Sequence, residues 1–280
     1  YTLWFGGFVV LLNEFDNQPN NKTTKPQNHK TTKPQNHKTT KQQNHQTTKP
    51  PNNKTQMIHN PKIECMDRDA MRKLQSKRLI ETVKRCYENI PFYKHRMDDL
   101  GVKPEDIKSI DDIHKLPFTT KHDLRDEYPF GLQAVPHEQI RRIHASSGTT
   151  GKPVVFTYTE NDLKHWSEGV ARCLAVADIG HGDTVQVSYG YGMFTGGMGI
   201  HDGIAARGAI QLPTSSGNTV KQIMLMQDFG STALACTPSY AMHIAESIHA
   251  SKIVSVNKMK LRAGFFGAEP WTEGMRKELE

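Results

Sequence analysis

Hydrophobic residues recur at helical spacing in the first part of the chain that follows residue 56. Residues 66–88 place apolar side chains near that spacing with charges between them, which predicts an amphipathic helix that Pro91 ends. The apolar positions are Met71, Leu74, Leu79, Val83 and Cys86. Residues 98–129 are charged and interrupted by prolines, a texture typical of small helices joined by turns.

From Ile140 onward, strand-like and helix-like patterns alternate. Thr159 and Asp162 have the spacing of a capping box, and the apolar face that follows predicts a helix to about Ala177. Strands are expected at 154–158, 184–189, 209–213, 232–236 and 261–265, and further helices at 196–207, 218–228 and 239–250. This alternation predicts an α/β fold with mainly parallel sheets flanked by helices. In such folds ligands bind where loops leave the carboxyl ends of the strands.

The first 56 residues have a different texture. Lys22–His29 reads KTTKPQNH, the same octad recurs at 30–37, and it recurs with one change at 38–45. Because almost nothing apolar lies between Pro19 and Gln56, this stretch cannot offset the entropy of ordering, and we expect a disordered tail. An eight-residue period is also what a tandem repeat of eight codons would produce. We therefore divide the chain into a non-native tail, 1–56, and a folded part, 57–280; the alternative is a polybasic interaction tail.

The apolar run at the start of the chain, residues 1–12, is too short to cross a bilayer, since a helical span needs roughly 20 residues. It is either a truncated signal peptide or translated upstream sequence, and we favour the second interpretation.

The distribution of charge and the cysteines argue against nucleic-acid binding and against a metal site. Eight lysines against Glu14 and Asp16 give the tail +6 of the formal +7, which leaves +1 for residues 57–280. A nearly neutral folded part has no electrostatic footprint for nucleic acid. The four cysteines are far apart and show no metal-ligand spacing, so we expect reduced, buried thiols, a cytoplasmic protein and no metal site.

The strongest chemical feature is an eight-residue loop between two predicted strands. Its glycines let successive N–H groups face one anion, its hydroxyls add donors, and its lysine supplies a mobile positive charge for phosphate. It is not a Walker A loop, because Ser146 replaces the first glycine and Pro153 follows the lysine. The alternative is an ordinary polar hairpin loop. The residues are Ser146, Ser147, Gly148, Thr149, Thr150, Gly151, Lys152 and Pro153.

Two further loops follow predicted strands. The segment Tyr189–Gly197 mixes aromatic residues with glycines, which suits a slot where Tyr189 and Phe194 pack against an aromatic ring; the alternative is a core aromatic cluster. Thr195 occupies the position of the third glycine of a dinucleotide fingerprint, which counts against that interpretation. Gly267–Pro270 is weaker evidence, since Glu269 could simply be an acid at a helix start.

These segments together resemble a known family. The octapeptide Ser146–Pro153 is similar to the phosphate-binding signature of the adenylate-forming superfamily, and the wider set resembles the phenylacetate-coenzyme A ligases within it. The resembling segments are LPFTT (116–120), HASSGTTGKP (144–153), YGYGMFTGG (189–197), IMLMQDFG (223–230), CTPSY (236–240) and GAEPW (267–271). The resemblance covers essentially all of 57–280 and none of the tail.

The resemblance implies specific roles. It assigns ATP phosphates to Ser146–Lys152 with Lys152 catalytic, adenine to Gly267, Ala268, Glu269 and Pro270, and the acid to Tyr189, Phe194 and Gly267. It implies ATP, Mg²⁺ and coenzyme A as cosubstrates, and a large N-terminal domain of an adenylate-forming enzyme. Family members continue beyond the point that corresponds to Glu280, so we expect an incomplete chain. Family members are also commonly dimers. The alternatives are a ligase for another aromatic acid or a deazaflavin cofactor, and a non-catalytic nucleotide-binding fragment.

Overall fold

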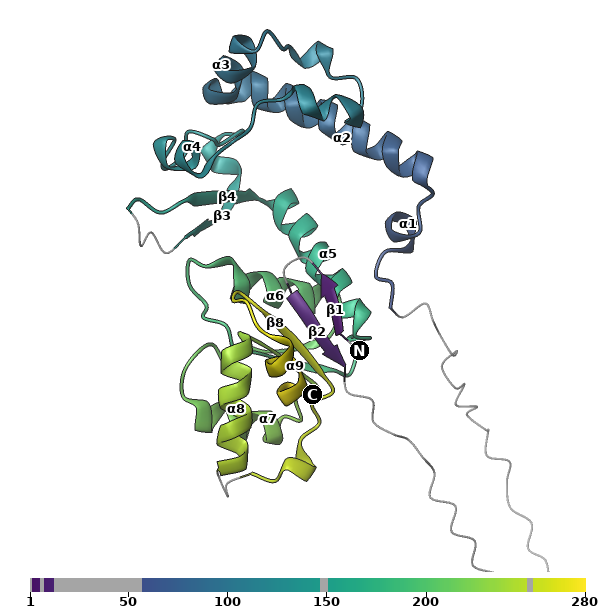
Figure 1. The fold of residues 1–280 in the computed structure, drawn as a ribbon, viewed down its shortest axis with the longest axis vertical. Helices are drawn as coiled ribbons and strands as arrows, with labels where there is room; N and C mark the ends of the chain where they lie inside the picture. The colour runs from purple at the N-terminus through teal and green to yellow at the C-terminus, as the bar shows by residue number, and fades with distance from the viewer. Residues whose placement is uncertain (1, 6–7, 13–56, 147–150, 251–253) are drawn as a thin grey trace, which may run out of the picture.

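The computed structural model describes residues 2–5, 8–12, 57–146, 151–250 and 254–280 (Figure 1). A helical unit comes first among residues 57–139, with α1 (Pro61–Glu64), α2 (Arg68–Asn89), α3 (Pro91–Asp99), α4 (Lys121–Asp126) and three 3₁₀ turns at 104–106, 110–115 and 137–139. The predicted amphipathic helix is confirmed as α2. Pro91 both ends α2 and opens α3, because proline at the first helical position gives up an N–H that would have no partner there.

The main sheet contains the predicted parallel strands. In the order β8–β7–β5–β6, four strands run parallel: β5 (Thr184–Val187), β6 (Ile210–Leu212), β7 (Ala233–Cys236) and β8 (Ala263–Gly267). A hairpin of β1 (Thr2–Phe5) and β2 (Phe8–Leu12) pairs antiparallel with the outer edge of β8. The predicted α/β class is confirmed, and each predicted strand in this region lies within a few residues of an observed one.

Helices cover both faces of the parallel strands (Figure 1). Along β7 the side chains alternate: Ala233 and Ala235 pack with α5 (Glu160–Val176) and α6 (Thr195–Ala206), whereas Leu234 and Cys236 pack with the opposite helices. Those opposite helices are α7 (Thr219–Asp228), α8 (Pro238–Ala250) and the C-terminal α9 (Glu273–Leu279). Because both faces are covered, β5, β7 and β8 are buried along their whole length. β7 and β8 accordingly read as apolar runs, whereas β5 keeps the polar Thr184 and Gln186 buried among its valines.

The strands around the predicted phosphate loop form a sheet of their own. β3 (Ile140–Ala145) pairs antiparallel with β4 (Val155–Thr159), apart from the main sheet. The expectation that ligand-binding loops leave the carboxyl ends of parallel strands is therefore wrong for the predicted phosphate loop, which joins the two strands of an antiparallel hairpin. It holds for the loops after β5 and β8.

Two expectations about the tail and the thiols need correction. Residues 2–5 and 8–12 form strands where a disordered tail was expected; apolar and β-branched residues at 8–12 suit pairing with the N–H and C=O groups along the edge of β8. The octad repeat lies outside the described residues. All four cysteines are free, but Cys65 is exposed and Cys86 only partly buried, so the expected burial holds only for Cys173 and Cys236.

Glycines allow α5 and α6 to approach closely. A Cβ atom added at Gly203 would lie 2.4 Å from Val170 Cγ1, and one added at Gly199 would lie 2.4 Å from Trp166 Cζ2. These distances are far below van der Waals contact, so the two glycines, four residues apart on one face of α6, set the spacing of the helices.

We expect Gly203→Ala to lower the free energy of unfolding by about 1–3 kcal/mol, since the added methyl group overpacks a buried contact. Gly169→Ala is the matched control, because a Cβ at Gly169 of α5 meets nothing within 4 Å and alanine favours the helix. Urea unfolding of both variants provides the measurement. Equal stability of the two variants would contradict the close packing of α5 on α6.

Candidate active site

The β3–β4 hairpin closes the base of the predicted phosphate loop. The Ser146 amide donates to the carbonyl of Val154 over 2.9 Å, and the Val154 amide donates to Ser146 Oγ over 2.9 Å. Gly151 has φ of +125°, a conformation that favours glycine. Of the predicted phosphate-binding residues, Ser146, Gly151 and Lys152 are described, whereas Ser147, Gly148, Thr149 and Thr150 lie outside the described residues. The loop therefore has a fixed base on the strand side.

Lys152 lies exposed at the end of this loop. Its ammonium nitrogen lies 5.5 Å from the centroid of the Tyr128 ring, over the ring face, in a cation–π arrangement. Contacts of this kind are weak at exposed sites, about 0.5–1 kcal/mol. A phosphate oxygen, which offers a charge-assisted hydrogen bond, would compete well for the same ammonium group.

One carbonyl group joins the hairpin to the aromatic loop after β5. Met193 O accepts a hydrogen bond from the Ala145 amide over 3.0 Å and another from His144 Nδ1 over 2.9 Å. His144 is almost fully buried, so its ring is a fixed part of this connection. The end of β3, where the phosphate loop begins, is thereby held against the loop that carries Tyr189 and Phe194.

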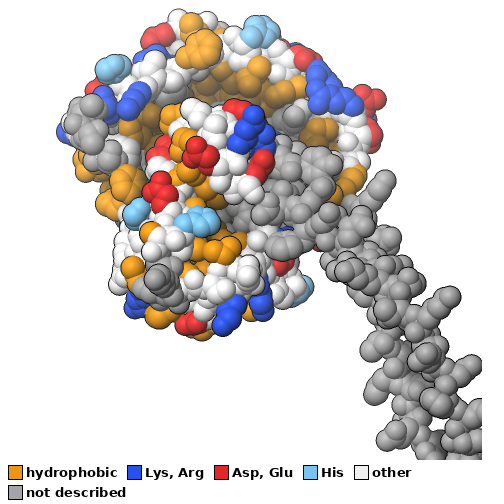
Figure 2. All heavy atoms as spheres, turned by 60° about the horizontal axis from the view of Figure 1, so that its bottom comes forward, with side chains coloured by type: hydrophobic (Ala, Val, Ile, Leu, Met, Phe, Trp, Pro, Cys, Tyr) orange, Lys and Arg blue, Asp and Glu red, His pale blue; other side chains and the backbone are white. Residues whose placement is uncertain are grey.

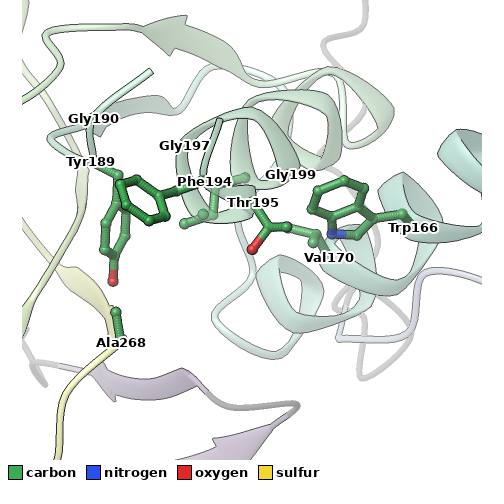
Figure 3. A pocket seen from close by; sticks show the side chains of 11 residues that line it. Trp166, Val170, Tyr189, Gly190, Phe194, Thr195, Gly197, Gly199 and Ala268 are labelled. Carbon is green, nitrogen blue, oxygen red and sulfur yellow. The ribbon is translucent and has the colours of Figure 1, made fainter. Parts of the chain in front are cut away.

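A cavity of about 580 Å³ opens beside the aromatic loop. Figure 3 shows Tyr189, Phe194 and Ala268 toward one end of it and the Trp166 indole toward the other, with Thr195 and Val170 between. Tyr189 is buried, whereas Phe194 is 57% exposed and lies at the rim. A volume of this size, with aromatic and glycine walls, suits a small aromatic molecule. The structure thus brings Tyr189 and Phe194 to one cavity, and their role in binding an aromatic ring remains a prediction.

The Tyr189 hydroxyl connects the ends of two neighbouring strands. It donates to the carbonyl of Cys236, at the end of β7, over 2.5 Å and lies 3.3 Å from the carbonyl of Gly267, at the end of β8. Burial raises the pKa of this phenol well above its usual range, so it remains a neutral donor at every physiological pH. Gly267, predicted to contact the acid, is not among the residues that line the cavity, but it lies behind the lining residue Tyr189 and next to the lining residue Ala268.

The predicted adenine segment is fixed by Glu269. Its carboxylate accepts from the Ser239 amide over 2.6 Å, at the start of α8, and hydrogen bonds from the Ser239 side chain and backbone lower the pKa of Glu269 below its usual range. Glu269 is thus an acid at a helix start, but of α8 rather than of the helix that follows it. Ala268 has φ of +72°, a strained backbone for a residue with a Cβ, and its side chain lines the cavity.

Most of the remaining cavity wall was not identified as functional from the sequence. Trp166 and Val170 were interpreted only as the apolar face of a helix, and the α6 residues only as a glycine-containing helix. A usable signal was present in the glycines of α6, since small residues at helix spacing indicate close contact with a neighbour. The lining residues outside the predicted loops are Trp166, Val170, Gly199 and Ile200, whereas Gly190, Thr195, Gly196 and Gly197 belong to the predicted aromatic loop and Ala268 to the predicted adenine segment.

The described residues show no sign of a charged interaction surface on the face displayed in Figure 2, of a metal site or of a membrane-spanning helix. Figure 2 shows basic and acidic side chains interspersed on the face that it displays, without a large field of one sign. In the described ranges, no group of three or more His, Cys, Asp or Glu residues could hold a metal ion. Within the same ranges, no helix has the length and apolar character needed to span a membrane.

The chain has clear relatives among curated proteins. It is 47% identical over 224 residues to a phenylacetate-coenzyme A ligase of Thermus thermophilus, covering 80% of this chain and 50% of the relative. It is 48% identical over 227 residues to a phenylacetate-coenzyme A ligase of Escherichia coli, covering 80% of this chain and 52% of the relative. The chain thus spans about half the length of the curated relatives it matches. No family model matches it.

Solved structures give the same class. A 2-hydroxyisobutyryl-coenzyme A ligase, crystallised in an open conformation with 2-HIB-AMP and coenzyme A, aligns with a TM-score of 0.74 at 25% identity over 85% of this chain and 53% of its own. The fold of this chain is therefore similar to that of a coenzyme A ligase crystallised with an acyl-AMP. Within that class, the sequence relationship is to the phenylacetate-coenzyme A ligases, as the motifs predict.

We expect Glu269→Gln to destabilise the fold by about 0.5–1 kcal/mol at neutral pH, because a neutral amide is a weaker partner for the start of α8. Since the folded pKa of Glu269 is lowered, its contribution is present above the ordinary value of 4.5 and is lost as the pH falls through the folded pKa. Denaturant unfolding at several pH values should therefore show a difference from wild type that shrinks on acidification. Glu278→Gln, an exposed change on α9, is the control; an equal pH effect there would contradict the role of Glu269.

Proposed function

We propose that residues 57–280 form the ATP-binding and acid-binding part of a ligase that converts phenylacetate to phenylacetyl-AMP and then to phenylacetyl-coenzyme A. The observation that carries this proposal is the cavity between the ends of β5 and β8, because its aromatic loop is held directly against the hairpin of the phosphate loop. The 46–48% identity to phenylacetate-coenzyme A ligases supports the choice of acid.

The residues take the roles that their positions allow. Ser146–Lys152 bind the ATP phosphates, and Lys152 is the catalytic residue that meets the charge of the triphosphate. Gly267–Pro270 lie against the adenine. Tyr189, Phe194 and Gly267 border the acid. The start of α6 also lines the cavity, and its N-cap residue, Phe194, makes no side-chain cap hydrogen bond. The N–H groups and dipole of a helix start favour an anionic ligand such as a carboxylate.

The chemistry requires two anions to meet. The carboxylate attacks the α-phosphorus of ATP and pyrophosphate leaves; the coenzyme A thiol then attacks the carbonyl of the acyl adenylate, and AMP leaves. No general base is needed in the first step, since the nucleophile is already a carboxylate. The work of this chain is to offset repulsion and hold the reactants in line, through loop N–H groups and Lys152. Mg²⁺ would enter on the triphosphate, and we assign it and coenzyme A no protein ligand among the described residues.

Three further expectations accompany the proposal. Residues 1–56 are a non-native tail even though the β1–β2 hairpin within it pairs with β8, and residues 57–280 belong to an AMP-dependent synthetase N-terminal domain. The enzyme is cytoplasmic, in keeping with its free thiols. It acts on small molecules as a homodimer, as its relatives commonly do. A ligase for another aromatic acid or a deazaflavin, and a non-catalytic nucleotide-binding protein, are the alternatives that the following experiment separates.

We expect Lys152→Ala to weaken binding of Mg·ATP by this chain about ten- to a hundredfold, the size of a lost charge-assisted hydrogen bond. Titration calorimetry of wild type and variant measures this directly. Lys164→Ala is the matched control, because Lys164 is an exposed lysine on α5 paired only at 3.7 Å with Glu160. Pyrophosphate release with phenylacetate and with a panel of aryl acids, measured on the complete gene product extended past Glu280, should accompany the titration.

The outcomes separate the proposals. Phenylacetate-dependent pyrophosphate release that falls with Lys152→Ala supports the ligase. Release only with another acid transfers the assignment to that acid. ATP binding without release for any acid favours the non-catalytic alternative, and ATP binding that is insensitive to Lys152→Ala removes this residue from the site.

A further inference from the structure

The orientation of the Trp166 indole is fixed from several sides. It stacks on the ring of Tyr158, with centroids 5.1 Å apart and an interplanar angle of 28°, and it meets the His144 ring edge-on at 5.4 Å. His144 is itself held by Met193 O. Gly199 lies on the other side, so close that no side chain fits between the indole and α6. A large aromatic group held in this way is a rigid wall rather than a movable filler.

The nucleotide side of the cavity defines the direction in which an acid would lie. Ala268 lines one end and belongs to the segment proposed to contact adenine, so a carboxylate that attacks the α-phosphorus must point toward that end. Tyr189 and Phe194 lie toward the same end as Ala268, and Trp166 lies toward the opposite end (Figure 3). The part of an acid farthest from its carboxylate therefore faces the indole.

We propose that Trp166 is the residue that limits the length of the acid that this cavity accepts, and that Gly199 sets this limit by letting the indole lie flat against α6. The inference rests on the proposed function, since it assumes that the cavity binds an aryl acid. It adds the substrate class: arylacetates without a large substituent opposite the acetate group. An acid extended by a second ring at that position would meet the indole.

The test is direct binding of two probes, phenylacetate and 4-biphenylacetate, to the chain in the presence of Mg·ATP, by titration calorimetry. We expect Trp166→Ala to raise the affinity ratio of 4-biphenylacetate to phenylacetate by about tenfold or more, because apolar pockets discriminate by size to that extent. Trp166→Phe should give an intermediate ratio. An unchanged ratio in Trp166→Ala overturns the proposal.

A second variant tests the same wall without deleting the indole. Gly199→Ala places a methyl group 2.4 Å from Trp166 Cζ2, so it should push the indole into the cavity and weaken binding of phenylacetate about tenfold. Unchanged phenylacetate binding in this variant overturns the role of Gly199. Trp166→Ala also removes a packed side chain and is expected to lower the stability of the fold, so Met226→Ala serves as the control for lost stability. It deletes a fully buried side chain in the other core cluster, and should lower stability without changing the ratio.

The failure of this inference differs from failure of the proposed function. If wild type binds phenylacetate and the ratio does not respond to Trp166, only the length limit is wrong. If wild type binds Mg·ATP but no aryl acid, the acid assignment is wrong, and the length limit with it.

Discussion

The buried hydroxyl of Tyr189 is the contact on which the geometry of the carboxyl edge of the sheet depends. Tyr189 follows β5, and its hydroxyl reaches the terminal carbonyls of β7 and β8, so one side chain sets the relation among three strand ends. Because a buried carbonyl without a donor is costly, the ring has little freedom to turn away. The same ring lines the cavity, and a structural hydrogen bond thereby fixes a binding surface.

A second constraint joins two sheets that share no strand. The phosphate-loop hairpin is antiparallel and separate from the main sheet, yet Met193 O accepts from both the backbone and the His144 side chain of β3. A shift of the aromatic loop would break both hydrogen bonds together. The hairpin of the predicted phosphate loop and the cavity are therefore positioned as one unit, as the proposed reaction between two bound anions would require.

The sequence predicted the elements well and the site in part. Buried strands such as β7 and β8 carry apolar runs bounded by polar loops, and α2 and α5 have amphipathic spacing, so their positions follow from local pattern alone. Tyr189 and Phe194 were identifiable because aromatic residues beside glycines are unusual in a loop. Trp166 was not, because a tryptophan on a helix face looks the same whether it faces a core or a cavity. Only the close packing of α6 against Trp166, which Gly199 permits, shows that this tryptophan faces a cavity rather than the core.

The sequence by itself determined the α/β class and the order of the helices and strands from residue 57 onward, and it singled out three loops as candidate sites, because periodicity and short motifs are local properties of the chain. The tertiary structure decided which loops meet. It placed the phosphate loop on a separate hairpin, directed Glu269 to a helix distant in sequence, and made Trp166 a cavity wall. These contacts join residues many positions apart, and they depend on side-chain packing between elements, which no local pattern encodes.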